Sequence, residues 1–359
     1  TAAAPASGEF LGHPRGLYVC FFTEMWERFS FYGMKVLLLL YLTKYHLFSD
    51  DAGYELLGAY AGLVYAMPVL GGLIADRWLG MRKSVVLGGV LLCAGHLGMA
   101  FEGEQARIVD GAVEQDALAL QVFYFSLALI VMGVGFLKPN ISTIVGRLYP
   151  QDDPRRDSGF TLFYMGINLG AFASALVCGW LGETHGWHYG FGASGIGMLI
   201  GLGVFLLGQK HLLGQAEPPD AVSLRQRLAC GLNREWAIYL AVLGGVLVVW
   251  GLIRFPPAVH GAMHGVTLAL GAGIGWFMWK HCTRTEARRM GVLLALIVFS
   301  VVFWALYEQS YGSWILYSDR VMNRQAFGVE WTASQLAQIY YCRGLALQGL
   351  DKDKINQVL

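Results

Sequence analysis

The sequence predicts an all-α protein that crosses a membrane many times. Of its 359 residues, 55% are hydrophobic and only 14% carry a charge, and the mean hydropathy is +0.48. This composition is too apolar for a water-soluble domain of this length. The apolar residues gather in long windows without the alternation of a β-barrel, and backbone groups in lipid need partners within their own segment, so the windows are expected to be helices.

Nine windows are long enough to cross the hydrocarbon core, which takes about 20 mostly apolar residues. They are residues 17–42, 55–78, 84–101, 120–147, 160–181, 190–208, 236–253, 263–280 and 290–317. No features of a cleaved signal peptide precede the first window, where the chain reads TAAAPASGEFLGHPRG. The first helix is therefore expected to remain in the protein.

The basic residues between the windows predict the orientation. If the N-terminus is cytoplasmic, the inner loops hold 14 Lys and Arg residues and the outer loops hold three, Lys44, Arg107 and Arg254. Such an excess marks the cytoplasmic side, so the N-terminus is predicted to lie inside. The net charge of +1 gives no basic excess for a nucleic acid, and the six scattered Cys have no metal-ligand spacing. No nucleic-acid partner, metal or cofactor is therefore expected.

Ionisable residues lie on the first predicted helix, directly before the apolar run 36–40. At 3.6 residues per turn, one face about 140° wide carries six residues, namely Glu24, Glu27, Arg28, Phe31, Tyr32 and Lys35. Four charges at membrane depth would cost roughly 10 kcal/mol, so this face must point into protein or water. Snorkelling of Lys35 toward the outer end and a purely structural Glu–Arg pair are the alternatives.

Two further charges are predicted at membrane depth. Lys138 stands in the fourth window next to Pro139, which removes a backbone donor and bends a helix. Glu308 stands in the ninth window, with Trp304 one turn before it. Together with the first helix this makes three carboxylates and three cations, a set that can bind a zwitterion and pass protons.

Weaker signals lie in the second and fifth windows. Tyr164 and Asn168 share a helix face in the fifth window, where Gly166 and Gly170 form a GxxxG sequence that favours close helix packing. Tyr65 in the second window fits a core position and an interface position equally well.

Two polar residues lie in and before the third window. Asp76 stands in the short turn before it, and we expect this carboxylate to pair with nearby cations or with a facing helix N-terminus, as a latch that breaks when the bundle rocks. His96 stands within the window and is expected to make a satisfied polar contact.

Four stretches of the sequence occur in an order typical of one transporter family. They are Glu24-x-x-Glu27-Arg28-Phe29 with Tyr32-Gly33, GGLIADRWLG at 71–80, KPN at 138–140 and FYMGINLG at 163–170. Over about residues 18–320 the chain resembles the proton-coupled oligopeptide transporter family of the major facilitator superfamily. The resemblance implies uptake of di- and tripeptides with protons, through rocking of two helix bundles in the inner membrane of a bacterium.

The resemblance also implies roles for residues at matching positions. Proton coupling is implied for Glu24, Glu27, Arg28 and Glu308; substrate binding for Arg28, Tyr32, Tyr65, Lys138, Tyr164, Asn168, Trp304 and Glu308; and gating for Lys35, Asp76 and Glu308. It implies no cofactor beyond the coupling protons, and we expect a monomer in the lipid bilayer.

The polar break from Gln209 to Asn233 and the same resemblance predict the domain organisation. We expect a six-helix bundle at 1–209, a cytoplasmic linker at 210–234, an extra two-helix hairpin at 235–282, the first helix of a second bundle at 283–320 and an unassigned tail at 321–359. Family members continue with five more helices, which supply half of the pocket. The tail holds no spanning window, so the functional expectation concerns the intact parent protein.

Two positions depart from the usual pattern of the family. Phe31 stands where many members have Tyr, so a hydroxyl is missing from this face. Lys35 stands where Arg is common. A bidentate contact with Glu308, which the planar guanidinium of Arg could make, is therefore replaced by the contact of one ammonium group.

Other functions are weighed against peptide uptake. One is proton-coupled uptake of another small anion or zwitterion, such as nitrate or an amino-acid conjugate, and another is a membrane receptor that does not transport. An intramembrane hydrolase is disfavoured because the windows contain no GxSxG, no HExxH and no paired Asp. The protein is therefore not expected to be an enzyme.

Overall fold

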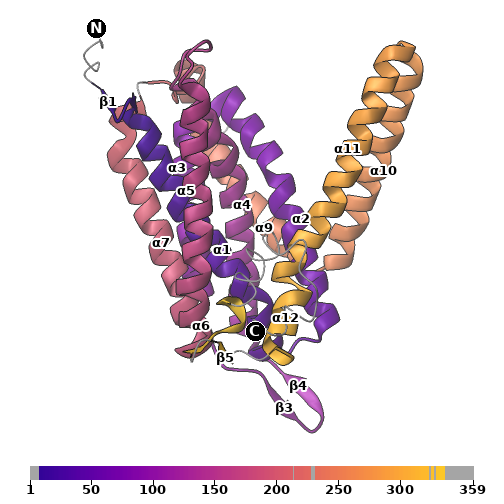
Figure 1. The fold of residues 1–359 in the computed structure, drawn as a ribbon. Coiled ribbons are helices and arrows are strands. Elements are labelled where there is room, and N and C mark those ends of the chain that lie inside the picture. The colour runs from indigo at the N-terminus through magenta and orange to yellow at the C-terminus, as the bar shows by residue number, and fades with distance from the viewer. Residues whose placement is uncertain (1–7, 213, 228–230, 323–324, 327–328, 336–359) are drawn as a thin grey trace.

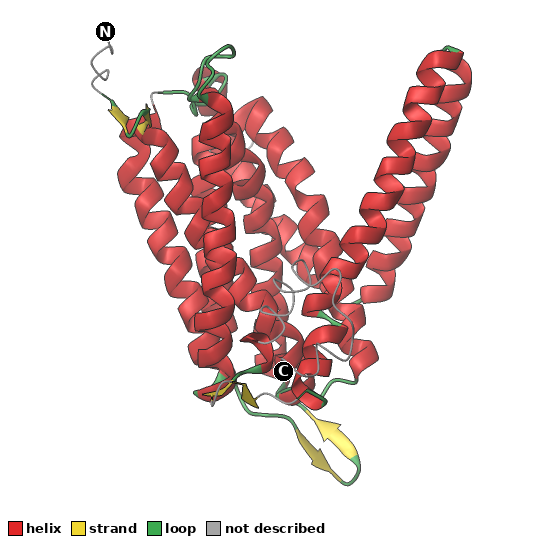
Figure 2. Ribbon diagram, in the orientation of Figure 1, coloured by secondary structure: helices red, strands yellow, loops and turns green. Residues whose placement is uncertain are grey.

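The computed structural model of the chain describes residues 8–212, 214–227, 231–322, 325–326 and 329–335. Helices make up nearly all of this part, as a bundle of long helices from which two others diverge (Figures 1 and 2). The predicted all-α fold is therefore confirmed. The predicted tail at 321–359 lies mostly outside the described residues.

The long helices account for the nine predicted windows, although the third window runs two residues past the end of its helix. The helices are α1 (Arg15–Lys44), α2 (Asp50–Ile74), α3 (Met81–Met99), α4 (Ala117–Arg147), α5 (Arg156–Ser174), α6 (Trp180–Thr184), α7 (Trp187–Gly208), α8 (Ala221–Arg225), α9 (Arg234–Ile253), α10 (Pro256–His281), α11 (Arg284–Glu308) and α12 (Ser313–Arg320). Turns of π-helix at Ala75–Leu79 and Ala175–Gly179 and of 3₁₀-helix at Gln209–Leu212 and Gln309–Tyr311 extend or join them.

Three small antiparallel ribbons complete the secondary structure. They pair β1 (Glu9–Phe10) with β2 (His13–Pro14), β3 (Arg107–Val109) with β4 (Ala112–Glu114), and β5 (Gln325–Ala326) with β6 (Val329–Glu330). The residues of β3 and β4 are all exposed, so this ribbon stands clear of the helices.

Six helical segments of the described chain are long and apolar enough to cross a membrane. They contain α2, α4, α5 with α6, α7, α9, and α11 with α12, each with the short turn that extends it. The similarly long α1 carries Glu24, Glu27, Arg28 and Lys35 within its apolar sequence. The chain is therefore an integral membrane protein whose first helix is unusually rich in charge.

Side chains fix where several helices begin. Ser49 accepts a hydrogen bond from the backbone of Ala52 at the start of α2, and Thr283 and Glu286 form a reciprocal capping box at the start of α11. Asp116 caps α4, and hydrogen bonds from the backbone N–H groups of Ala119, Glu104 and Leu118 hold the pKa of its carboxyl below the usual range. These caps satisfy backbone donors that a helix start otherwise leaves unpaired.

The helix α1 lies at the centre of the bundle. It packs against α5 and α7, while α3 packs against α4 and α7, and α2 packs against α4. The four Leu residues at 37–40 are completely buried, so the apolar run that follows the charges forms part of the core.

The helices α9 to α11 lie outside this bundle. The helix α9 packs against α4, and α10 packs against α2 and then against α11. Within α10 only Val259 is buried, and α11 has no buried residue. Figure 1 shows α10 and α11 close to the bundle near α12 and diverging from it toward the N-terminus. We call the end of the bundle that holds the N-terminus the N-terminal side, and the end with α12 and the β3–β4 ribbon the opposite side.

The prediction for His96 was wrong. Its side chain is 1% exposed, and neither ring nitrogen has a hydrogen-bond partner. The stripe of α3 that carries His96 packs against α4, where Gly95 meets Ile130, and this contact encloses the ring among apolar side chains. A neutral imidazole is the form compatible with such a site, because charging it would leave an unpaired ion in low dielectric.

The prediction for Gly166 and Gly170 is confirmed. A Cβ at Gly166 would lie 2.8 Å from the Phe21 ring, and one at Gly170 would lie 3.0 Å from the Phe29 amide nitrogen and closer still to the Met25 carbonyl oxygen. The two glycines therefore let α5 approach the backbone of α1 directly.

A leucine at Gly170 is expected to destabilise the protein, because a Cβ there meets the backbone of α1, which cannot move aside. The expected loss is about 2 kcal/mol or more, read as a lower thermal unfolding temperature in detergent. Gly203→Leu on α7 is the matched control, since a Cβ at Gly203 meets nothing within 4 Å. Equal melting temperatures for the two variants would contradict the packing described above.

Candidate functional site

The charged face of α1 points into protein. Glu24, Glu27 and Arg28 are 2%, 0% and 3% exposed. Arg28 donates through Nη2 to Glu27 Oε1 at 2.6 Å and through Nε to Glu27 Oε2, while Glu24 Oε1 lies 3.4 Å from Arg28 Nε. One guanidinium is thus shared between two buried carboxylates, and the predicted Glu–Arg contact is present.

The two carboxylates of this group are not equivalent. Both oxygens of Glu27 accept hydrogen bonds from Arg28. Glu24 Oε2 is buried without a hydrogen-bond partner. The protein therefore satisfies the two oxygens of Glu27 but only one of those of Glu24.

A second ion pair connects the first helix to the diverging part of the chain. Lys35 Nζ on α1 donates to Glu308 Oε2 at the end of α11 at 2.5 Å, and Tyr65 on α2 donates to the other oxygen of Glu308 at 3.3 Å. The Lys35 side chain is 3% exposed and that of Glu308 is 29% exposed. The pair therefore places a buried cation against a carboxylate that solvent can reach.

Aromatic rings surround these charges. The Lys35 ammonium lies 4.4 Å from the ring centroid of Tyr311, which stacks on Tyr32 at 6.0 Å, and the Arg28 guanidinium lies 5.0 Å from the Phe31 ring. Because Tyr311 comes from the turn after α11, this stack is a second contact between the first bundle and α11.

Lys138 is the cation of the site without a carboxylate partner. It lies on α4, is half-buried, and holds its ammonium 5.5 Å from the ring centroid of Tyr65. Within the described part of the chain no carboxylate oxygen lies at ion-pair distance from it. Its charge is therefore available to an anionic group that enters from solution.

Two more ion pairs join the bundle to α12 on the opposite side. Arg320 binds Asp50 through two hydrogen bonds of 2.7 and 2.8 Å, and Lys44 binds Asp319. These partners are more exposed than Lys35, so each pair contributes less stability than a buried one. Contacts between the first bundle and the α11–α12 segment thus gather on the opposite side.

Three predicted pocket residues lie apart from these contacts. Tyr164 and Asn168 are exposed on α5, where the Asn168 amide donates to the Tyr164 carbonyl oxygen at 2.9 Å, and Trp304 is half exposed on α11 beside the Phe303 and Tyr307 rings. The structure brings none of the three against Arg28 or Lys138 through a described contact.

Asp76 does not make the expected pairing. It is exposed in the π-helical turn after α2, and no ion pair or hydrogen bond to another described residue involves its carboxylate. The cations at the start of α3, Arg82 and Lys83, bind Glu217 and Glu235 instead. The linker and α9 supply carboxylates closer to these cations than Asp76 is.

Residues outside the predicted set complete the site. Tyr311 stands three residues after Glu308, a spacing that puts both on one helical face, so the sequence carried a signal for it. Asp50, Asp319 and Arg320 are ordinary loop or helix-end charges, and nothing in the sequence paired them. Among the described residues there is no group of three or more His, Cys, Asp or Glu side chains that could hold a metal ion.

An all-helical membrane protein with charges buried inside its helices, and with one cation free for an incoming anion, has the features of a secondary transporter. The comparisons with known proteins agree with this class. The PTR2 model, described as the POT family, matches residues 82–341. The chain belongs to the POT family, and its helices follow the major facilitator fold of that family's solved structures.

Individual relatives give the extent of the similarity. The chain is 37% identical to the uncharacterized transporter YclF of Bacillus subtilis (strain 168), over 92% of this chain and 65% of that protein. It is 33% identical to the peptide transporter YePEPT of Yersinia enterocolitica, over 91% of this chain and 64% of that protein. The chain thus spans less than two thirds of the length of these relatives.

One solved structure similar to this chain contains a ligand. It is a mutant of the peptide transporter POT in complex with alafosfalin, 33% identical, with a TM-score of 0.74, and the alignment covers 94% of this chain and 67% of that one. The similarity includes the helices that hold the buried charges described above.

Removing Glu308 is expected to cost more stability than removing Lys35. Glu308→Gln leaves the buried Lys35 ammonium without its anion, whereas Lys35→Met leaves a carboxylate that water can reach. Glu308→Gln in the full-length protein should lose about 3 kcal/mol, measured by thermal unfolding in detergent, and the double variant should lose less than the sum of the two. Glu114→Gln in the exposed ribbon is the control, and strictly additive losses would show that the pair does not form.

Proposed function

We propose that the full-length protein is a secondary transporter that imports di- and tripeptides together with protons by alternating access. The observation that carries this proposal is the free cation Lys138 close to the buried carboxylates that share Arg28. A peptide has a carboxylate for the cations and an amino group for a carboxylate, so it matches such a set of charges. The ligand-bound and named peptide transporters among the relatives support the same substrate class.

In the proposed binding mode, Lys138 and Arg28 hold the carboxylate of the peptide. Tyr32, Tyr65, Tyr164, Asn168, Trp304 and Glu308 are the proposed contacts for its backbone, amino terminus and side chains. Tyr65 supports this reading, because its ring lies under Lys138 while its hydroxyl binds Glu308. Phe31 lies next to Arg28 and is only 5% exposed, so its ring offers the peptide no polar contact.

Proton coupling is proposed to arise from competition for Arg28. A peptide carboxylate that binds Arg28 draws the guanidinium away from Glu27 or Glu24, and a buried carboxylate that loses its cation takes up a proton. Glu24, Glu27 and Glu308 are the proposed proton carriers, with Arg28 as the group that links their charge to substrate binding. Loss of the proton restores the carboxylate–Arg28 contact and favours release of the peptide.

Gating is proposed for Lys35, Asp76 and Glu308. The Lys35–Glu308 pair and the α12 contacts close the opposite side, while α10 and α11 diverge on the N-terminal side (Figure 1). If the N-terminus is cytoplasmic, this arrangement is open to the cytoplasm. The exposed Asp76 then belongs to a latch that forms when the cytoplasmic side closes.

The remaining assignments follow the same proposal. The protein is placed in the inner membrane of a bacterium with its N-terminus in the cytoplasm, as a monomer that needs no cofactor beyond protons. The helices up to residue 209 form the first bundle, the linker covers 210–234, the extra hairpin covers 235–282, and 283–320 begins the second bundle. Homologues of this family are transporters, so an enzymatic activity is not proposed.

Glu27→Gln in the full-length protein is expected to abolish proton-driven uptake of di-alanine into liposomes. The amide cannot accept a proton, and it weakens the two hydrogen bonds from Arg28. Exchange of labelled for unlabelled peptide without a gradient should persist, since a neutral Gln resembles a protonated Glu27 and leaves Arg28 free to bind the peptide. Glu114→Gln is the control for a carboxylate outside the bundle, and gradient-driven uptake that survives in Glu27→Gln would refute the coupling role.

Lys138→Gln is expected to raise the KM for di-alanine roughly tenfold or more, because one charge-assisted contact to the carboxylate is lost. Lys210→Gln, at an exposed linker position, removes the same charge without touching the site and should leave the KM unchanged. A peptide amide without a carboxylate should bind the parent and Lys138→Gln equally. A KM that does not respond to Lys138→Gln would refute the carboxylate contact. Failure of unlabelled di-alanine to compete for uptake would argue for nitrate or another small anion or zwitterion, and binding without any uptake would argue for a receptor.

A further inference from the structure

A groove on the outer face of α3 is not used by the proposed transport mechanism. It lies on the N-terminal side between α7 and α9, and has a volume of about 400 Å³. The lining residues are Arg82, Lys83, Val86, Leu87, Val90, Leu206, Gln209, Glu235 and Tyr239. The five from α3 follow one stripe of the helix, which at 1.5 Å per residue extends for about 12 Å along its axis.

The two ends of the groove differ in polarity. Its polar end carries Arg82 and Lys83 at the start of α3, and its apolar end carries Val86, Val90 and Leu206 deeper along the helices. Val90 and Leu206 are 50% and 47% exposed, so the apolar end is open at the surface. A groove with one polar end and one open apolar end fits an amphiphilic molecule that lies along the helices.

The position of the polar end matches the boundary between lipid and water. Trp78 at the end of α2 and Trp236 at the start of α9 are exposed at this same end of the bundle. Exposed Trp side chains favour the headgroup level of a bilayer. Arg82 and Lys83 are thus held at the height of lipid phosphates, with the apolar part of the groove at the height of the acyl chains.

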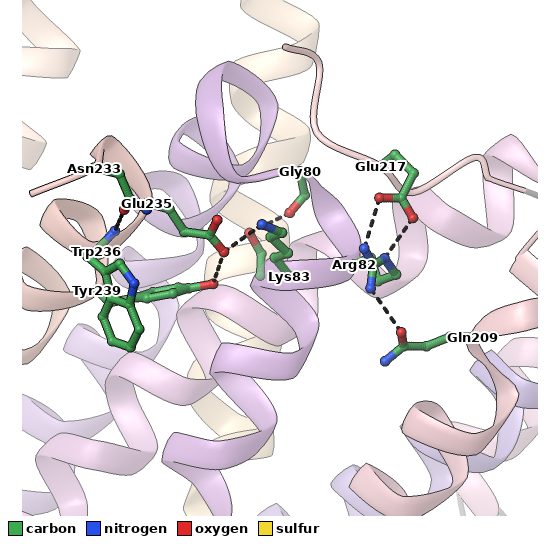
Figure 3. Close-up of polar contacts among 10 residues, drawn as sticks. Gly80, Arg82, Lys83, Gln209, Glu217, Asn233, Glu235, Trp236 and Tyr239 are labelled. Carbon is green, nitrogen blue, oxygen red and sulfur yellow. Dashed lines mark hydrogen bonds and ion pairs between the residues drawn. The ribbon is translucent and has the colours of Figure 1, made fainter. Parts of the chain in front are cut away.

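The two cations keep hydrogen-bond donors that the protein does not use. Arg82 donates to both oxygens of Glu217 at 2.7 and 2.9 Å and to Gln209 at 3.0 Å, which leaves two of its five N–H groups. Lys83 donates to Glu235 at 2.5 Å, which leaves two of its three N–H groups. Figure 3 shows Arg82 directed to one side and Lys83 to the other, so the carboxylates fix both cations in place.

The charge around the groove favours an anion. Residues 75–83 and 209–239, which meet at this end, carry seven cations and four carboxylates, namely Arg77, Arg82, Lys83, Lys210, Arg225, Arg227 and Arg234 against Asp76, Glu217, Asp220 and Glu235. An excess of basic charge at the cytoplasmic surface attracts anionic lipids by roughly 1 kcal/mol for each residue near the surface in general, which corresponds to about fivefold in affinity. A zwitterionic lipid lacks this attraction.

We propose that this groove binds an anionic phospholipid of the cytoplasmic leaflet, with its phosphate at Lys83 and one acyl chain along Val86, Val90 and Leu206. The site rests on the proposed cytoplasmic position of the N-terminus and is separate from the peptide site. Because lipid binding is read without transport, a failure here is distinguishable from a failure of the proposed peptide uptake.

The test uses full-length protein depleted of lipid, titrated with dioleoyl-phosphatidylglycerol and separately with dioleoyl-phosphatidylcholine, with bound lipid counted by native mass spectrometry. Phosphatidylglycerol is expected to be retained in preference, and an excess of inorganic phosphate should not displace it. Equal retention of the two lipids, or full displacement by phosphate, would overturn the proposal.

Two variants test the contacts of the lipid headgroup and of the lipid acyl chain separately. Lys83→Gln should weaken phosphatidylglycerol retention roughly fivefold, while Arg288→Gln near the start of α11 should not change it. Val86→Trp fills the groove and leaves both ion pairs intact, so it should abolish retention even if Lys83→Gln disturbs α9. Val113→Trp in the exposed ribbon is the matched control, and retention unchanged by Val86→Trp would contradict the site.

Discussion

The burial of charge within α1 is the constraint on which the rest of the structure depends. An ion inside a low-dielectric bundle is tolerated only next to a counter-ion and with its hydrogen bonds satisfied. Arg28 therefore lies against Glu27 and Glu24, and protein has to cover the face of α1 that carries them. The glycines of α5 make this possible, because they let a second helix reach the backbone of α1 at the level of the charges.

The contacts between the first bundle and α11 differ in what they contribute. Arg320 and Asp50 are both exposed, so water can replace either partner at little cost in free energy. The same holds for Lys44 in its pair with Asp319. Lys35 cannot, because its side chain is 3% exposed and has Glu308 as its anion. The stacked Tyr32 and Tyr311 rings add a contact that does not depend on charge. A neutral side chain at position 308 would thus weaken the contact with Lys35, because it leaves the buried Lys35 ammonium without its anion.

The sequence predicted those parts of the structure that depend on local spacing. The helices, the single charged face of α1 and the close approach at Gly170 all follow from periodicity and composition. The partners of other charges did not follow from spacing, because a partly exposed cation such as Arg82 can pair with any carboxylate that the fold brings near. The distant Lys35–Glu308 pair was expected only from the resemblance, and it is present. Asp76 was chosen for its neighbours in sequence, yet Glu217 of the linker lies against Arg82. The prediction for His96 was wrong for a related reason, since packing buried its ring without a hydrogen-bond partner.

The linker is fixed to the first bundle more firmly than its composition implies. The Arg82 backbone N–H donates to the Ala216 carbonyl oxygen at 2.8 Å, and the linker backbone at Pro218 lies so close to Gly80 that a Cβ there would be 2.5 Å from its nitrogen. Gly80 also has a φ of 77°, which only glycine adopts without strain. With Lys83 bound to Glu235, the linker and the start of α9 follow the turn between α2 and α3. A movement of α11 relative to the first bundle would therefore have to occur after α9, because these contacts hold the linker and the start of α9 to the first bundle.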